Sequence, residues 1–181
     1  MFNDLGAIER ADVSGGLVSL TTPEDNGADD LDPLSTVVHI DSPEFFNKFV
    51  VQFTDGGIGI DDATVARDGS QFTLTQAAIE GGQVTTRTLL NNVDYIFAYN
   101  ANTNEAILTS LTVFPQDARY TLLVDNSAVF GIKDLAGGDL IPNQTDGTVR
   151  FDILVTGGAN DPPENAIPGT QTVVENTVSA P

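Results

Sequence analysis

Apolar residues in this chain recur at every second position over short segments, and no segment sustains the period of an amphipathic helix. Successive side chains of a β-strand point to opposite faces, so this pattern places one face of each segment in a core. In one such segment, Phe49, Val51 and Phe53 share a face. The pattern predicts strands over residues 36–40, 47–53, 72–74, 94–100, 105–111, 119–126 and 147–155.

Gly, Asn, Asp and Pro separate these segments, which is typical of an all-β chain with tight turns. We predict a two-sheet antiparallel β-sandwich of about seven strands over residues 34–156, with extended N- and C-terminal segments. The Asn-rich stretch 100–104 is predicted to turn a hairpin, because such turns need residues that tolerate positive φ. Residues 1–33 are expected to form an acidic segment with one possible strand at 16–20, and residues 157–181 a linker followed by a single strand.

The charge of the chain is strongly one-sided, since 26 acidic and 7 basic residues give a formal net charge of −19. So few basic residues cannot neutralise a phosphate backbone, which excludes nucleic acid as a partner. The acidic residues are 19 Asp and 7 Glu, and Asp is typical of turns and of cation-binding loops. This excess favours bound Ca²⁺, and the alternative is the generic acidic surface of a salt-adapted protein.

Three acidic stretches carry the candidate calcium ligands. Ca²⁺ takes about six to eight oxygens from carboxylates, Asn side chains and backbone carbonyls, and these stretches offer such oxygens on turn-forming sequence. The alternative for each is an Asx turn, in which the carboxylate caps its own backbone. The candidates are Glu24, Asp25, Asn26, Asp29, Asp30 and Asp32 in the first stretch, Asp55, Asp61 and Asp62 in the second, and Asn160, Asp161 and Glu164 in the third.

The residues that catalysis would need are scarce. The chain has no Cys, and its single His, His39, lies in a predicted strand outside any recognisable catalytic motif. No glycine-rich phosphate loop opens a helix. We therefore predict no catalytic residues and no enzymatic activity. The N-terminal residues lack the apolar core of a signal peptide, and no apolar run is long enough to cross a bilayer, so membrane insertion is not expected.

Carbohydrate binding is the alternative among binding functions, because binding sites for small molecules are often lined by exposed aromatic rings. The chain has no Trp and three Tyr. Tyr95 and Tyr99 share the phase of Phe97, and Tyr120 shares that of Leu122, so all three are predicted to lie in the core. Two coplanar rings in an exposed groove would favour sugar binding instead.

Four stretches resemble the bacterial Ig-like domains found in tandem in S-layer and giant cell-surface proteins. In chain order they are FVVQFTDGGIGIDDATV, DYIFAYNANTNEAILTSL, YTLLVDNSAVFGIKDLAGGDL and GTVRFDI. One departure is Gly138, at a position where the family often has Asn. The resemblance implies an Ig-like sandwich that serves as a structural or adhesive module, extracellular or at the cell surface.

The C-terminal stretch ANDPPENAIPGTQTVVEN resembles the junction that opens cadherin-like repeats in large bacterial surface proteins. This resemblance implies calcium at the third acidic stretch and a chain that ends one strand into the next module. A lone strand cannot bury its apolar side chains, so the alternative is strand addition to a neighbouring copy, in a self-assembling fibre or surface layer. The strand-addition residues would be Gln171, Thr172, Val173, Val174, Glu175, Asn176, Thr177 and Val178.

Together these features predict a non-catalytic module of a large secreted or cell-surface bacterial protein, made rigid by Ca²⁺ at its acidic turns and junctions. Its expected partners are neighbouring modules of the same polypeptide or copies of itself, with surface glycans as further candidates.

Overall fold

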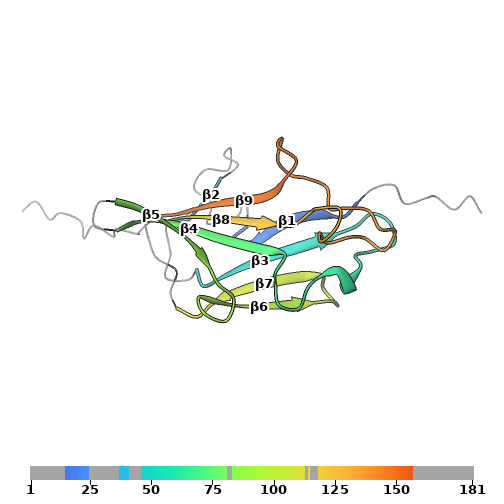
Figure 1. Ribbon diagram of the computed structural model, residues 1–181, viewed down its shortest axis with the longest axis horizontal. Helices are drawn as coiled ribbons and strands as arrows, with labels where there is room; N and C mark the ends of the chain where they lie inside the picture. Colours follow the sequence, from blue (N-terminus) through green and yellow to red (C-terminus); the bar gives the residue numbers. More distant parts are fainter. Residues whose placement is uncertain are drawn as a thin grey trace, which may run out of the picture.

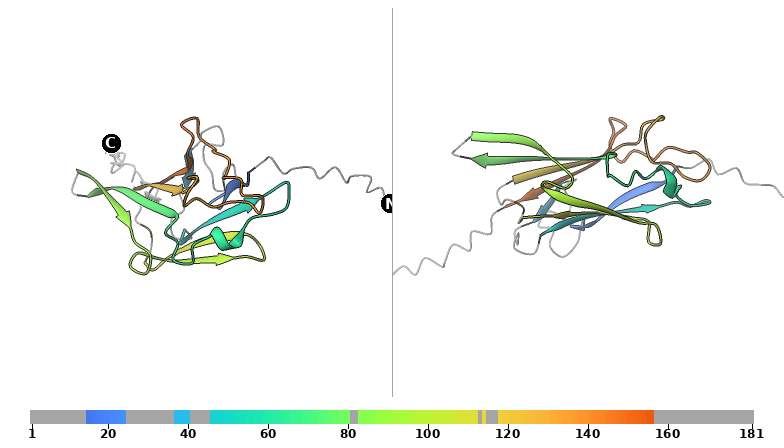
Figure 2. Two further views of the ribbon diagram at one scale, coloured as in Figure 1. Left: turned by 45° about the vertical axis from the view of Figure 1, so that its right-hand side comes forward. Right: turned by 60° about the horizontal axis from the view of Figure 1, so that its bottom comes forward.

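The computed structural model confirms the predicted all-β fold with two sheets. The sheets pack face to face as a sandwich (Figures 1 and 2). One sheet has four strands in the order β1-β3-β7-β6, and the other has five in the order β2-β9-β8-β4-β5. The residues that the structure describes are 15–24, 37–40, 46–80, 83–112, 114 and 118–156.

The described strands include all the predicted segments and the possible strand at 16–20, β5 is an addition, and β4 continues well beyond the predicted 72–74. The predicted hairpin is confirmed as β6 paired with β7, and Asn104 in its turn has a positive φ of 52°. The strands are β1 (Leu17–Thr22), β2 (Val37–Ile40), β3 (Lys48–Thr54), β4 (Phe72–Glu80), β5 (Gln83–Leu89), β6 (Tyr95–Asn100), β7 (Glu105–Ser110), β8 (Ala118–Val124) and β9 (Val149–Val155).

The strand count and the start of the sandwich correct the prediction, because the described residues form nine strands and the first of them belongs to the sandwich. β1 pairs with β3 and buries Leu20 in the core, so the sandwich begins at Leu17 rather than at residue 34. β5 was missed because its residues from Gln83 to Thr88 are all exposed, so it lacks the apolar alternation that marks a half-buried strand.

The predicted antiparallel arrangement holds for every strand pair of the two sheets except one. β2 pairs with β9 in parallel, with Val38 opposite Ile153. Parallel and antiparallel strands have the same apolar alternation when one face is buried, so the sequence pattern of 36–40 could not show the direction of pairing.

The core lies between the two sheets and contains a cluster of four aromatic rings. Phe49 of β3 contacts the rings of Phe46, Phe114 and Tyr120, at centroid distances of 4.9, 5.1 and 5.8 Å. All four side chains are buried. The predicted inward face of β3 is confirmed, because Phe49, Val51 and Phe53 are exposed by no more than 1 %.

Two long loops meet at one end of the sandwich, which we call the loop end. Residues 55–71 connect β3 to β4, and residues 125–148 connect β8 to β9. An antiparallel bridge between Ile60 and Asp134 joins the two loops. Ile60 and Ile132 are buried in the core, so the loops close this end of the sandwich with apolar side chains.

The described chain enters the sandwich at the loop end and leaves it at the opposite end (Figure 1). Leu17, where β1 begins, lies opposite Thr54, where β3 ends and the first loop begins. Val155, where β9 ends, lies opposite Ala118, where β8 begins, at the far end. The described chain therefore enters and leaves the sandwich at opposite ends.

An ion pair links the edge strands of the two sheets. Arg87 of β5 donates to the carboxylate of Asp94, just before β6, with 2.8 Å between Arg87 Nη1 and Asp94 Oδ1. The backbone N–H of Leu90 donates to Asp94 Oδ2 at 2.8 Å. On the inner side, Arg87 Nε donates to Gln76, whose amide lies 3.4 Å from the hydroxyl of Tyr120. These contacts connect Tyr120 in the core with the side of the sandwich where β5 and β6 are the edge strands.

Replacing Asp94 with asparagine tests this link through its pH dependence. The Leu90 N–H, and then the hydrogen bond and charge of Arg87, hold the pKa of Asp94 below its usual value. A carboxyl whose pKa is lower in the folded state stabilises the fold at pH values above its unfolded pKa, and this contribution is lost as pH falls through the folded pKa.

We therefore expect Asp94→Asn to be less stable than the wild type at pH 7, with the difference shrinking below about pH 4. Urea unfolding of both proteins at pH 7 and pH 3 measures it. A difference that stays constant with pH would show that the charge of Asp94 contributes nothing.

Candidate functional site

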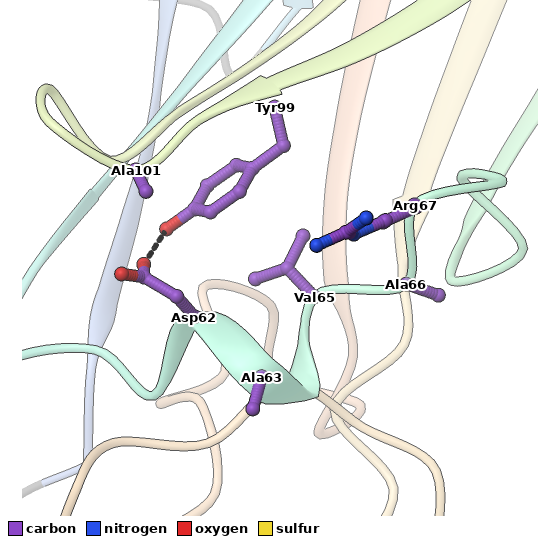
Figure 3. Close-up of a pocket in the computed structure, with 7 residues that line it drawn as sticks. All are labelled: Asp62, Ala63, Val65, Ala66, Arg67, Tyr99 and Ala101. Carbon is purple, nitrogen blue, oxygen red and sulfur yellow. Dashed lines mark hydrogen bonds between the residues drawn. The ribbon is translucent and has the colours of Figure 1, made fainter.

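A pocket of about 610 Å³ opens at the loop end between η2 (Asp62–Thr64) and the turn of the β6–β7 hairpin. This volume falls in the range of about 300–1,000 Å³ that is typical of small-molecule sites. Figure 3 shows side chains from two separate parts of the chain facing one another across it. The lining residues are Asp62, Ala63, Val65, Ala66, Arg67, Tyr99 and Ala101.

Local hydrogen bonds form the η2 side of the pocket. Asp61 caps η2, because its carboxylate accepts a hydrogen bond from the N–H of Ala63 at 3.0 Å. The buried side chain of Val65 anchors the following residue in the core. Gln71 then fixes the loop, since its Oε1 accepts from the N–H of Ala66 at 2.7 Å and its Nε2 donates to the carbonyl oxygen of Thr64. The backbone just before Arg67 is therefore held at Thr64 and Ala66.

Tyr99 forms the opposite wall of the pocket. Its hydroxyl donates to Asp62 Oδ1 at 2.6 Å (Figure 3). Its ring packs at 66° against the buried ring of Phe53, with 6.3 Å between the centroids. Burial, and then the hydrogen bond and charge of Asp62, raise the pKa of Tyr99 far above its usual value. The hydroxyl is therefore a permanent hydrogen-bond donor, and it holds the carboxylate of Asp62 in place.

Arg67 gives the pocket its positive charge. Figure 3 shows its side chain extending over Val65 toward Tyr99. In the described part of the chain, no carboxylate forms an ion pair with Arg67. Four other basic residues are paired there, namely Arg87 with Asp94, Arg119 with Asp152, Lys133 with Asp139, and Arg150 with Asp146 and Asp152. Arg67 differs from these four residues, because it lines a pocket and forms no ion pair with a described carboxylate.

The structure describes all three candidate residues of the second acidic stretch, and each of their carboxylates accepts a hydrogen bond from a different group. Asp55 accepts from the N–H of Gly59 at 2.7 Å, Asp61 caps η2, and Asp62 accepts from Tyr99. Among the described residues, no three His, Cys, Asp or Glu side chains gather closely enough to hold a metal ion. Glu24 is exposed at the end of the first stretch. The other candidates, Asp25, Asn26, Asp29, Asp30, Asp32, Asn160, Asp161 and Glu164, and the strand-addition residues 171–178, lie outside the described residues.

Two buried carboxylate oxygens at the loop end accept no hydrogen bond from the described residues, namely Asp55 Oδ1 and Asp134 Oδ2. Asp134 is only 2 % exposed, and its other oxygen accepts from the N–H of Gly138 at 2.7 Å. A buried charge without a partner is costly, so a bound cation or water is the natural complement of these oxygens. Sequence reasoning missed Asp134, because it falls outside the acidic stretches.

Gly138 has a steric reason to be glycine. A Cβ at this position would lie 2.6 Å from Asp134 Oδ2, which is closer than real contacts allow. An asparagine at this position would displace the carboxylate of Asp134. Glycine at 138 and the buried position of Asp134 are therefore linked.

The aromatic and histidine side chains also have clear positions. Tyr95 and Tyr120 are buried, as predicted, whereas Tyr99 is only partly buried and lines the pocket. Tyr99 lies one residue before the end of β6, where the ring can pack on the core and still reach the surface. His39 Nε2 lies 3.2 Å from the hydroxyl oxygen of Thr156.

No protein-family model and no curated protein matches the chain. Among the described residues, no helix has the length and apolar character needed to span a membrane.

Proposed function

We propose that this chain is a non-catalytic structural and adhesive module of a large secreted or cell-surface bacterial protein, with an Ig-like fold. The observation that carries the proposal is the path of the chain, which enters the sandwich at Leu17 and leaves it at Val155 at the opposite end. Modules connected in this way stack end to end, with their long axes in line. The sequence resemblance to tandem surface domains supports the same role.

Calcium is the proposed stiffening ion. Its expected sites are the acidic stretches and the junction after residue 156, and the loop end offers one further place. The unpartnered oxygens of Asp55 and Asp134 fit a hard cation, because Ca²⁺ takes carboxylate and backbone carbonyl oxygens. A cation at either oxygen would neutralise a buried charge at the end where the described chain enters.

Calcium is expected to raise the unfolding midpoint of the protein in a way that Mg²⁺ does not. At a free Ca²⁺ concentration of about ten times Kd, one site adds about 1.4 kcal/mol of stability, and each kcal/mol raises the midpoint by about 2–4 °C. Thermal unfolding in EDTA, in CaCl₂ and in MgCl₂ at matched ionic strength measures this. Equal effects of the two ions would mean charge screening and would end the calcium proposal.

The variant Asp134→Asn tests whether the rise of the unfolding midpoint with Ca²⁺ comes from the loop end. The variant keeps the shape of the side chain and removes its charge, so a site at Asp134 predicts a smaller rise with Ca²⁺. Asp146→Asn is the matched control, because it removes one negative charge from an exposed turn of the same loop. A full calcium response in Asp134→Asn would place the ion at the other acidic stretches.

A self-assembling fibre or surface layer is the second candidate, and the open edge of β5 favours it. β5 lies at the edge of its sheet, and Val84 in this strand is 72 % exposed. An exposed edge strand offers unpaired N–H and C=O groups to a strand of another copy. Growth of particles by light scattering in the calcium experiment would favour this candidate over the single module.

A further inference from the structure

We propose that the pocket between η2 and Tyr99 binds an acidic sugar, a pyranose ring that carries a carboxylate. The proposal goes beyond the mechanical role, because a module that only spaces its neighbours needs no pocket. It rests on three features of the pocket: a guanidinium that forms no ion pair with a described carboxylate, a carboxylate held in place by a tyrosine, and an apolar surface between them.

Arg67 is the group that selects for a negative charge. A chain with a net charge of −19 repels anions, so an anion binds only where a local positive charge outweighs the overall field. Arg67 is available for this contact, because it forms no ion pair with a carboxylate of the described residues. The planar guanidinium matches a carboxylate through two parallel N–H···O bonds, which makes this contact both strong and directional.

Asp62 is the group that selects for hydroxyls. Its Oδ1 accepts from Tyr99, and its second oxygen can accept hydrogen bonds from a ligand. A simple anion such as phosphate or acetate would gain nothing from a neighbouring carboxylate and would be repelled by it. A ligand that carries hydroxyl groups beside its carboxylate satisfies Asp62 and Arg67 together.

The remaining lining favours a ring with apolar C–H groups. Ala63, Val65, Ala66 and Ala101 supply small apolar side chains, and the Tyr99 ring forms one wall (Figure 3). A pyranose combines C–H faces with hydroxyl edges, so it fits a pocket that has apolar and polar walls. Because the Asp61 cap and the Gln71 hydrogen bonds already hold the η2 side, binding requires little ordering of the loop.

The test is a titration of the full chain, followed by ¹H–¹⁵N NMR, with D-galacturonate and D-glucuronate against D-galactose and D-glucose. EDTA is present throughout, so that calcium bridging cannot account for binding and the result is independent of the calcium proposal. We expect saturable shifts of the amides from Ala63 to Arg67 and of Tyr99. The uronates should bind at least about tenfold more tightly than the neutral sugars, as a charged hydrogen-bonded pair predicts.

Arg67→Gln is expected to remove this preference for uronates. Lys48→Gln is the matched control, because Lys48 is an exposed basic residue where β3 begins, at the end opposite the pocket. It removes the same charge and should bind uronates as the wild type does.

Three results would overturn the proposal. They are equal affinity for uronates and neutral sugars, a uronate affinity unchanged in Arg67→Gln, and shifts with sodium acetate that match those with uronates. Loss of uronate binding in both variants would also count against it, because only the overall charge would then matter.

Discussion

Replacing Phe49 with alanine is expected to lower the free energy of unfolding by about 3–5 kcal/mol. Phe49 has 0 % exposure and contacts the rings of Phe46, Phe114 and Tyr120. The substitution removes apolar contact on every side of the ring and leaves a cavity between the sheets, which close-packed neighbours can fill only in part. Since small domains are stable by about 5–15 kcal/mol, this is a large fraction of the total.

Urea unfolding at pH 7 measures the effect, with Phe130→Ala as the matched control. Phe130 lies in the loop between β8 and β9 and is 75 % exposed, so its truncation should change stability by no more than about 0.5 kcal/mol. Equal costs for the two substitutions would contradict the position of the core between the sheets.

Gln71→Leu is expected to lower the free energy of unfolding by about 2–4 kcal/mol. Leucine has a similar size to glutamine, but it cannot form the hydrogen bonds that Gln71 makes in this buried site. Gln71 is 9 % exposed, and its amide contacts three backbone groups. Its Oε1 accepts from the N–H of Ala66, and its Nε2 donates to the carbonyl oxygens of Thr64 and Phe130. Leucine would remove this partner from all three groups. A fully buried unsatisfied group costs about 1–3 kcal/mol, but these hydrogen bonds are only partly buried, so water replaces part of each loss and the total stays below the sum of three full costs.

The same substitution should loosen the loop that carries Arg67. Amide hydrogen exchange is expected to speed up at Ala66, whose N–H loses its acceptor. Gln83→Leu is the control for stability, because it makes the same chemical change at an exposed position of β5 and should change stability by at most about 0.5 kcal/mol. Unchanged exchange at Ala66 would show that Gln71 does not hold the loop.

The strands with alternating apolar residues were predictable because burial on one face leaves a local pattern. β3, β8 and β9 follow this pattern, and so does the β6–β7 hairpin, whose turn needs a residue such as Asn104 at positive φ. β5 leaves no such pattern. Its place at the edge depends on pairing with β4, a contact that no feature of its own residues encodes.

The pocket could not be predicted from the sequence, because it also depends on contacts between residues far apart in the chain. Asp62 was named as a residue of the second acidic stretch and Tyr99 as a strand residue with the phase of the core, whereas Arg67 was not singled out. Their separation along the chain is large, and only the packing of the first loop against the β6–β7 turn brings the Tyr99 hydroxyl to Asp62.

The sequence by itself determined the all-β class, the two-sheet sandwich and most of the strands, because side-chain burial in a strand is a local property with a period of two residues. Only the tertiary structure decided which strands lie at the edges, how β1 joins the first sheet, and which buried carboxylate oxygens accept no hydrogen bond from the described residues. It also decided that Arg67 faces Tyr99 across a pocket. These depend on contacts between residues far apart in the chain, and such contacts leave no periodic signal in the sequence.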